Sequence, residues 1–135
     1  MSVLVQTNQV ILVPNANYNV DASDTGKILM TPQTAGAVAV VYTLPAPAAG
    51  LHFRFVNGAP AALSGSVQIN TAAAAAILFG NVISGPTLGV AFLAVSGSTQ
   101  IRFLTAVSVL SDYDLYSDGT NWYVNAMSHG GRTVT

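Results

Sequence analysis

Short runs in which hydrophobic and polar side chains alternate recur along the whole chain. In one of them, Leu51, Phe53 and Phe55 alternate with His52 and Arg54. A period of two is typical of a β-strand that has one buried face. We therefore expect the three hydrophobic side chains to lie in a core, and His52 and Arg54 to point toward solvent.

Further apolar or alternating runs are separated by Gly, Pro, Asn and Asp, the residues that favour turns. They predict strands over 10–13, 18–21, 27–30, 37–44, 66–70, 81–84, 89–95, 99–104 and 107–110. Helix propensity is high only in the alanine run 72–76, which predicts one turn of helix or a loop of small side chains packed against a neighbour. The pattern predicts an all-β fold, a sandwich or jelly-roll-like barrel of about ten short antiparallel strands.

The strongest local signal lies near the C-terminal end, where two short strands flank a tight turn. Asp118 and Gly119 are typical of such turns, because glycine supplies the positive φ angle that they need. Asn121 also tolerates the left-handed region, and Trp122 and Tyr123 begin an aromatic return strand. We predict a β-hairpin with a four-residue connection and name these five residues as its structural determinants.

The first residues are more apolar than a free arm in water should be. Val3, Leu4, Val5, Val10 and Leu12 fall in a segment that we interpret as an N-terminal strand or arm, residues 1–13. A single β-sandwich domain is expected over 14–126, followed by a polar C-terminal tail over 127–135. These five side chains are candidates for contact with another subunit.

The composition strengthens that expectation. Hydrophobic residues make up 51% of the 135 residues and charged residues only 7%; Glu is absent, Lys27 is the single lysine, and the net charge is −1. An ordinary soluble domain carries about 25% charged residues. We therefore expect much of the surface to be covered in an assembly; the alternative is a small neutral secreted domain, which the absence of a basic signal-peptide start disfavours.

Several classes of function find no support in the sequence. Four scattered cations do not suit a nucleic-acid backbone, and no apolar run approaches the roughly 20 residues of a membrane span. Without cysteine there are no disulfides or thiolate sites. No nucleophile elbow or phosphate loop is present, and His52 and His129 lie far apart in the sequence. We predict no enzymatic activity, cofactor or metal.

The hairpin region suggests two weaker possibilities. Asp112, Asp114 and Asp118 could bind a hard cation such as calcium, although carboxylates at turns and strand ends more often bind backbone amides. The aromatic side chains of Tyr116, Trp122 and Tyr123 could stack on a sugar, although a hairpin tryptophan more often packs in a core.

Four segments together resemble a β-rich module that is common in virion proteins of tailed bacteriophages. They are DTGKIL at 24–29, YTLPAPAAGL at 42–51 with 53–57, VQIN at 67–70, and the hairpin at 111–124 with its SDGTNWYV end. The resemblance covers roughly residues 21–125. It implies a non-enzymatic structural role, usually as a trimer, in head decoration (cement) proteins or in fibres.

The resemblance and the absence of a shaft repeat favour a decoration protein made in the host cytoplasm. We expect a homotrimer that binds the major capsid protein on the outer surface of the phage head and stabilises it. The alternative is a receptor- or glycan-binding tip domain of a tail or head fibre, in which Tyr116, Trp122 and Tyr123 would be exposed.

Overall fold

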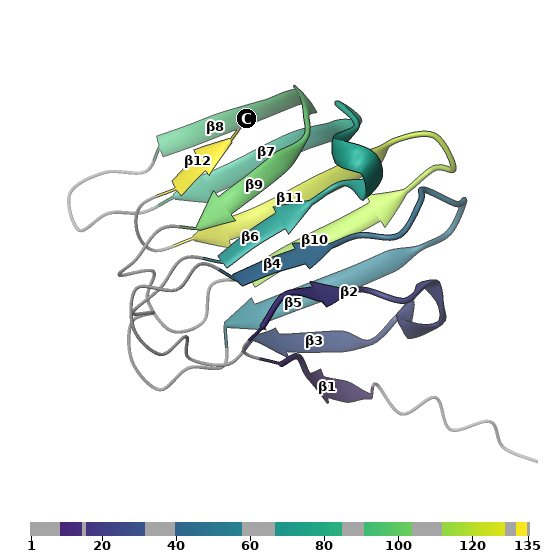
Figure 1. Ribbon diagram of the computed structural model, residues 1–135. Coiled ribbons are helices and arrows are strands. Elements are labelled where there is room, and N and C mark those ends of the chain that lie inside the picture. Colours follow the sequence, from purple (N-terminus) through teal and green to yellow (C-terminus); the bar gives the residue numbers. More distant parts are fainter. Residues whose placement is uncertain are drawn as a thin grey trace, which may run out of the picture.

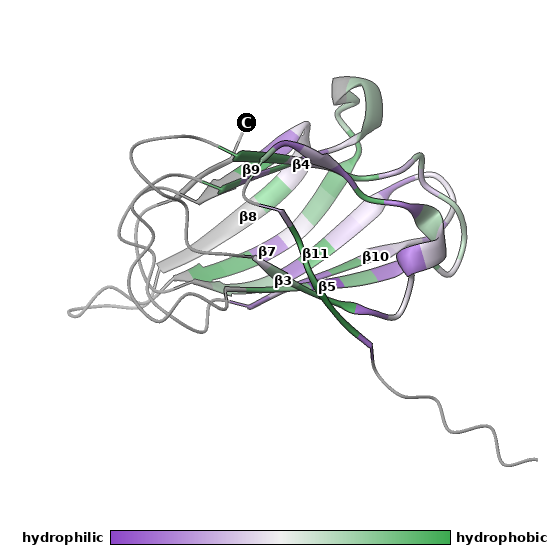
Figure 2. Cartoon of the chain, turned by 60° about the horizontal axis from the view of Figure 1, so that its bottom comes forward, coloured by the Kyte–Doolittle hydropathy of each residue, from purple (hydrophilic) through white to green (hydrophobic). Residues whose placement is uncertain are grey.

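Two β-sheets that face each other across an apolar core form the described part of the chain (Figures 1 and 2). The computed structural model describes residues 9–14, 16–31, 40–57, 67–84, 91–103, 112–128 and 132–134. The seven-stranded sheet contains, in spatial order, β1 (Val10–Leu12), β3 (Ile28–Thr31), β5 (His52–Asn57), β10 (Asp112–Ser117), β11 (Trp122–Ser128), β7 (Leu78–Ser84) and β8 (Ala91–Ser98). The five-stranded sheet contains β12 (Arg132–Val134), β9 (Gln100–Phe103), β6 (Val67–Asn70), β4 (Val40–Thr43) and β2 (Tyr18–Asn19).

The all-β prediction is confirmed at this level. The described residues contain no α-helix, only two short 3-10 helices, η1 (Ala22–Asp24) and η2 (Ala72–Ala74). The second of these lies in the alanine run, and Ala73 within it has a non-helical φ of +52°, so the segment lies between the helical turn and the loop that were expected there. No helix among the described residues is long and apolar enough to cross a membrane.

The expectation of antiparallel strands throughout is wrong, because five of the ten strand pairs are parallel. From β1 to β7 the chain crosses alternately from one sheet to the other, so that successive strands of one sheet run in the same direction. The described residues also hold twelve strands rather than about ten. Hydrophobic alternation identifies a buried face but does not tell which strand lies beside it.

The core between the sheets contains the side chains that the alternation assigned to it. Leu51, Phe53 and Phe55 are buried, whereas Arg54 is exposed and His52 half-buried on the opposite side of β5. The largest buried side chain is that of Trp122, whose ring centroid lies 5.7 Å from that of Phe53. The predicted inward and outward faces of this strand are therefore confirmed.

The predicted hairpin is present, with Asp118 to Asn121 connecting β10 to β11. The Asp118 carboxylate accepts hydrogen bonds from the backbone N–H groups of Thr120 (2.8 Å) and Asn121 (2.7 Å). Gly119 has a φ of +102°, a conformation that glycine adopts without steric cost. The turn residues named from the sequence are thus the ones that form the turn.

Both ends of the chain are described in part. Strand β12 pairs with β9 inside the segment expected to be a tail, and β11 extends to Ser128. Some of the residues and segments named from the sequence lie outside the described residues: Val3, Leu4, Val5, His129 and the strand predicted over 107–110.

Candidate functional site

One side of the seven-stranded sheet points away from the core, and we call it the open face. Every large hydrophobic side chain that is exposed among the described residues lies on this face: Val10, Leu12, Tyr116, Tyr123 and Met127. The strand register places them alongside Ile28, Met30, His52, Arg54, Val56, Phe79, Asn81, Ile83, Asp112, Asp114 and Asn125. The face therefore combines apolar side chains with a small group of charged ones.

Four rings form a row across the open face, one from each of four neighbouring strands. His52, Tyr116, Tyr123 and Phe79 are successive cross-strand neighbours in the register. The His52 and Tyr116 rings stack in parallel, with centroids 4.5 Å apart, and the Phe79 and Tyr123 rings are 6.3 Å apart and tilted by 35°. Stacking covers one side of the Tyr116 ring, which is unfavourable for a sugar platform.

Two pairs of polar side chains link β5 to β10 next to this row: Arg54 with Asp112, and His52 with Asp114. The Arg54 Nε donates to both carboxylate oxygens of Asp112, at 2.9 and 3.1 Å, and its Nη2 also donates to Oδ2. These hydrogen bonds from Arg54 to Asp112 raise the pKa of the guanidinium above its ordinary value. The His52 Nε2 lies 3.3 Å from Asp114 Oδ1.

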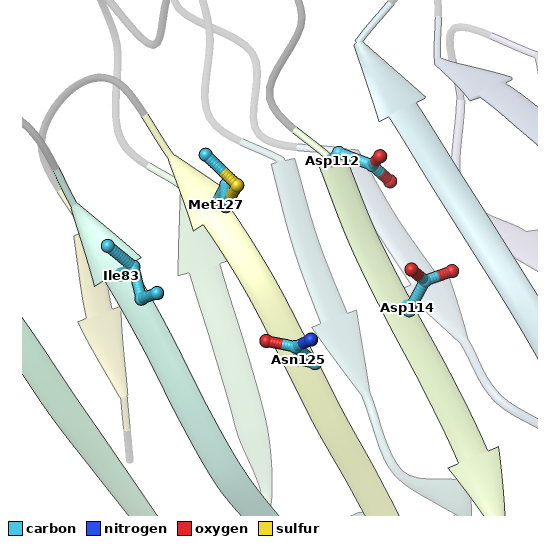
Figure 3. A pocket seen from close by; sticks show the side chains of 5 residues that line it. All are labelled: Ile83, Asp112, Asp114, Asn125 and Met127. Atoms are coloured by element: carbon cyan, nitrogen blue, oxygen red, sulfur yellow. The ribbon is translucent and has the colours of Figure 1, made fainter.

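A hollow of about 180 Å³ lies between β10, β11 and β7 (Figure 3). Asp112 and Asp114 on β10 line one side, and Asn125 and Met127 on β11 lie beside them. Ile83 on β7 completes the lining and pairs with Met127 in the register. The hollow thus joins two carboxylates and an amide to an apolar wall.

The three aspartates considered for a cation each have another partner, and they do not converge. Asp118 lies in the hairpin turn, where its second carboxylate oxygen accepts a hydrogen bond from the Tyr123 hydroxyl at 2.9 Å. Asp112 pairs with Arg54, and Asp114 approaches His52. The described residues contain no group of three or more His, Cys, Asp or Glu side chains that could hold a metal ion.

A sugar platform made of Tyr116, Trp122 and Tyr123 requires all three rings to be exposed, and for Trp122 this expectation is wrong. Trp122 is fully buried, because neighbouring residues of β11 point to opposite sides and Tyr123 occupies the open face. Its indole Nε1 has no hydrogen-bond partner among the described residues. Tyr116 and Tyr123 are exposed by 47% and 42%, as that hypothesis required.

Of the five apolar residues expected at a subunit contact, the structure describes two. Val10 and Leu12 are exposed by 49% and 75% on β1, an edge strand of the sheet, while the other three lie outside the described residues. Sequence reasoning missed Phe79, Ile83, Asn125 and Met127. The alternation of β11 could have indicated Asn125 and Met127, but nothing local predicts the parallel pairing of β11 with β7.

The outer side of the five-stranded sheet differs from the open face. It presents Val41, Thr43, Gln68, Asn70 and Gln100, while the alternate residues of the same strands are buried. The Gln68 amide donates to Asn70 Oδ1 at 2.7 Å and to Gln100 Oε1. This side is mainly a hydrogen-bonded polar surface.

Comparisons with protein-family profiles, with characterised proteins and with solved structures gave no match to this chain.

Proposed function

We propose that this protein is a non-enzymatic virion structural subunit, a capsid decoration protein that binds the outer surface of a phage head. The observation that carries the proposal is the difference between the two outer sides of the molecule. The exposed large hydrophobic side chains gather on the open face, whereas the described outer side of the opposite sheet presents amides, a threonine and the partly buried Val41. A subunit seated on a shell needs one contact side and one solvent side, and this arrangement suits both.

The low charge of the chain supports the same proposal. Interfaces are depleted in charged residues at their centres and enriched in aromatic residues and methionine. The open face has Tyr116, Tyr123 and Met127 exposed, and its Arg54 charge is already paired with Asp112. A contact of ordinary size, about 800 Å² per partner, would therefore cover mainly apolar and aromatic surface, with Asp114 and His52 as the further charged or titratable side chains on the face.

The proposed partners are the major capsid protein and two further copies of this chain, giving a homotrimer. The exposed β1 edge, with Val10 and Leu12, continues the open face, and no described strand pairs with its outer side. That the shell is a phage capsid follows, in this proposal, from the resemblance of the sequence to phage virion modules.

Binding to phage heads that lack the decoration protein tests the proposal. In a co-sedimentation assay, the wild-type protein should bind these heads, and Leu12→Lys should bind at least about tenfold more weakly, because a lysine ammonium would have to be buried at the contact. Gln68→Lys places the same charge on the outer side of the five-stranded sheet and should bind like wild type. Equal binding by both variants would count against the open face as the contact.

The fibre-tip alternative rests on the exposed rings of Tyr116 and Tyr123. Its support is weaker, because His52 covers one side of Tyr116 and Trp122 is buried. Saturable binding on a glycan array, lost in Tyr123→Ala, together with no binding to undecorated heads, would favour it over the decoration role.

A further inference from the structure

We infer that the hollow between β10, β11 and β7 binds a primary ammonium group carried on an aliphatic chain. We further infer that a lysine side chain of the capsid protein supplies this group in the assembly, a step that rests on the proposed function. The argument uses the charge of the hollow, the positions of its free acceptor atoms and its apolar wall.

The charge of the hollow is negative and only partly compensated. The Asp112 and Asp114 side chains are exposed by 29% and 28%, and both line the hollow. Arg54 is hydrogen-bonded to Asp112 and also attracts Asp114, which lies directly opposite it on β10. The His52 side chain beside Asp114 is charged only if it is protonated. The two carboxylates therefore share one permanent positive charge, and the remaining negative charge favours a cationic ligand.

The acceptor atoms fit an ammonium better than a guanidinium. Both oxygens of Asp112 already accept hydrogen bonds from Arg54, and Asp114 Oδ1 faces His52. No carboxylate of the hollow thus offers two free oxygens for the parallel hydrogen bonds of an arginine fork. An ammonium is a compact charge that needs separate single acceptors, and Asp114 Oδ2 with the Asn125 amide oxygen can provide them.

The far wall suits the aliphatic part of the ligand. Met127, which is 54% exposed, and Ile83 lie side by side on β11 and β7 across from the carboxylates (Figure 3). A lysine places its methylene groups along apolar surface while its charged end stays with polar partners. Methionine adapts its shape readily to such a chain.

The test is an NMR titration of the isolated protein with n-butylammonium chloride, followed through the backbone and side-chain amides. The resonances of Asn125 and Met127 should shift and saturate, while equal concentrations of n-butanol should leave them unchanged. Asp114→Asn should weaken the binding at least about tenfold. Asp21→Asn makes the same change on an exposed carboxylate of the η1 cap and should bind like wild type.

Three results would overturn the ammonium site: no localised shift, equal binding by Asp114→Asn and wild type, or tighter binding of n-butylguanidinium than of n-butylammonium. A second variant, Asn125→Lys, separates loss of the site from loss of the fold. It places a lysine of the chain itself beside Asp114, so it should melt no lower than wild type and yet lose n-butylammonium binding.

The source of the ammonium is tested separately on undecorated heads. If wild-type protein binds them and Asp114→Asn, which removes the carboxylate without adding a charge, binds at least about tenfold more weakly, a partner lysine is supported. If both bind equally, the partner lysine is overturned, while the titration still decides the ammonium site. If wild type does not bind the heads at all, the proposed function fails, and the partner lysine fails with it.

Discussion

At Gly80 the backbone of β7 lies too close to β11 for any side chain. Its φ is +131°, and a Cβ built there would lie 2.1 Å from the carbonyl oxygen of Val124. The pairing of β7 with β8 is irregular between Leu78 and Gly80. Glycine is therefore required here by both backbone conformation and contact distance.

Replacing this residue should be among the most damaging single changes in the chain. We expect Gly80→Ala to lower the free energy of unfolding by on the order of 2–4 kcal/mol, measured by urea denaturation. Gly26→Ala is the matched control, since Gly26 also has a positive φ, +80°, but has no atom within 4 Å of the added Cβ. It should cost about 1 kcal/mol. Equal losses in the two variants would show that contact with Val124 does not matter.

Single residues also show what the sequence could reveal of the candidate site. The outward positions of His52 and Arg54 followed from alternation alone, because the period of two needs no knowledge of neighbours. Asp112 and Asp114 are cross-strand neighbours of Val56 and Arg54, which lie far from them in the sequence. Their pairing with β5 could not be predicted, since it depends on the order of the strands in the sheet.

The β10–β11 hairpin is the element that the sequence predicts best, because every signal that forms it is local. We expect its turn to be sensitive to acid as well. Hydrogen bonds from the backbone N–H groups of Asn121 and Thr120, and from the Tyr123 hydroxyl, lower the pKa of the Asp118 carboxyl below 3.8. Such a carboxylate stabilises the turn above its ordinary pKa, and this contribution is lost as the pH falls through the lowered value.

An NMR titration of the side-chain carboxyl carbons should therefore give Asp118 a midpoint below 3.8. Asp118→Asn keeps an acceptor oxygen for the turn but has no titrating group. Its hairpin resonances should lose the acid-dependent change that wild type shows near that midpoint. A midpoint at or above the ordinary aspartate value would mean that the backbone hydrogen bonds do not hold the charge.

The remaining elements show the limit of local patterns. The strands β3, β4, β5 and β6 were each predicted near their observed positions, but their parallel partners were not. The sheet to which a strand belongs depends on how the chain alternates between the two sheets, which the hydrophobic pattern of a single strand does not reveal. The open face and the hollow arise from that crossing pattern, so they could not be predicted.

At the scale of the whole molecule, the low charge should decide how an assembly responds to salt. With 7% charged residues and the Arg54 and Lys27 charges paired within the chain, contacts between copies must rest mainly on apolar area and backbone hydrogen bonds. Salt screens interactions between exposed charges but weakens apolar contacts little.

Light scattering at low and high salt measures this directly. We expect the mass of a trimer of the 13.8 kDa chain, about 41 kDa, under both conditions. Dissociation by moderate salt alone would show that ion pairs hold the copies together. A monomer under both conditions would show that the isolated protein does not form the proposed trimer.

Because β1 to β7 alternate between the two sheets, strands of the seven-stranded sheet are synthesised before the strands that pair with them. Strand β3 pairs with β5, and β5 pairs with β10, so each forms its ladder only after the later strand has been synthesised. Until the β10–β11 hairpin leaves the ribosome, β5 and β7 have unpaired backbone edges, because the hairpin fills the space between them. Unpaired edges of this kind invite aggregation. The segment from residue 112 onward therefore completes the seven-stranded sheet. A translation product that stops before residue 112 would leave β1, β3 and β5 separated from β7 and β8.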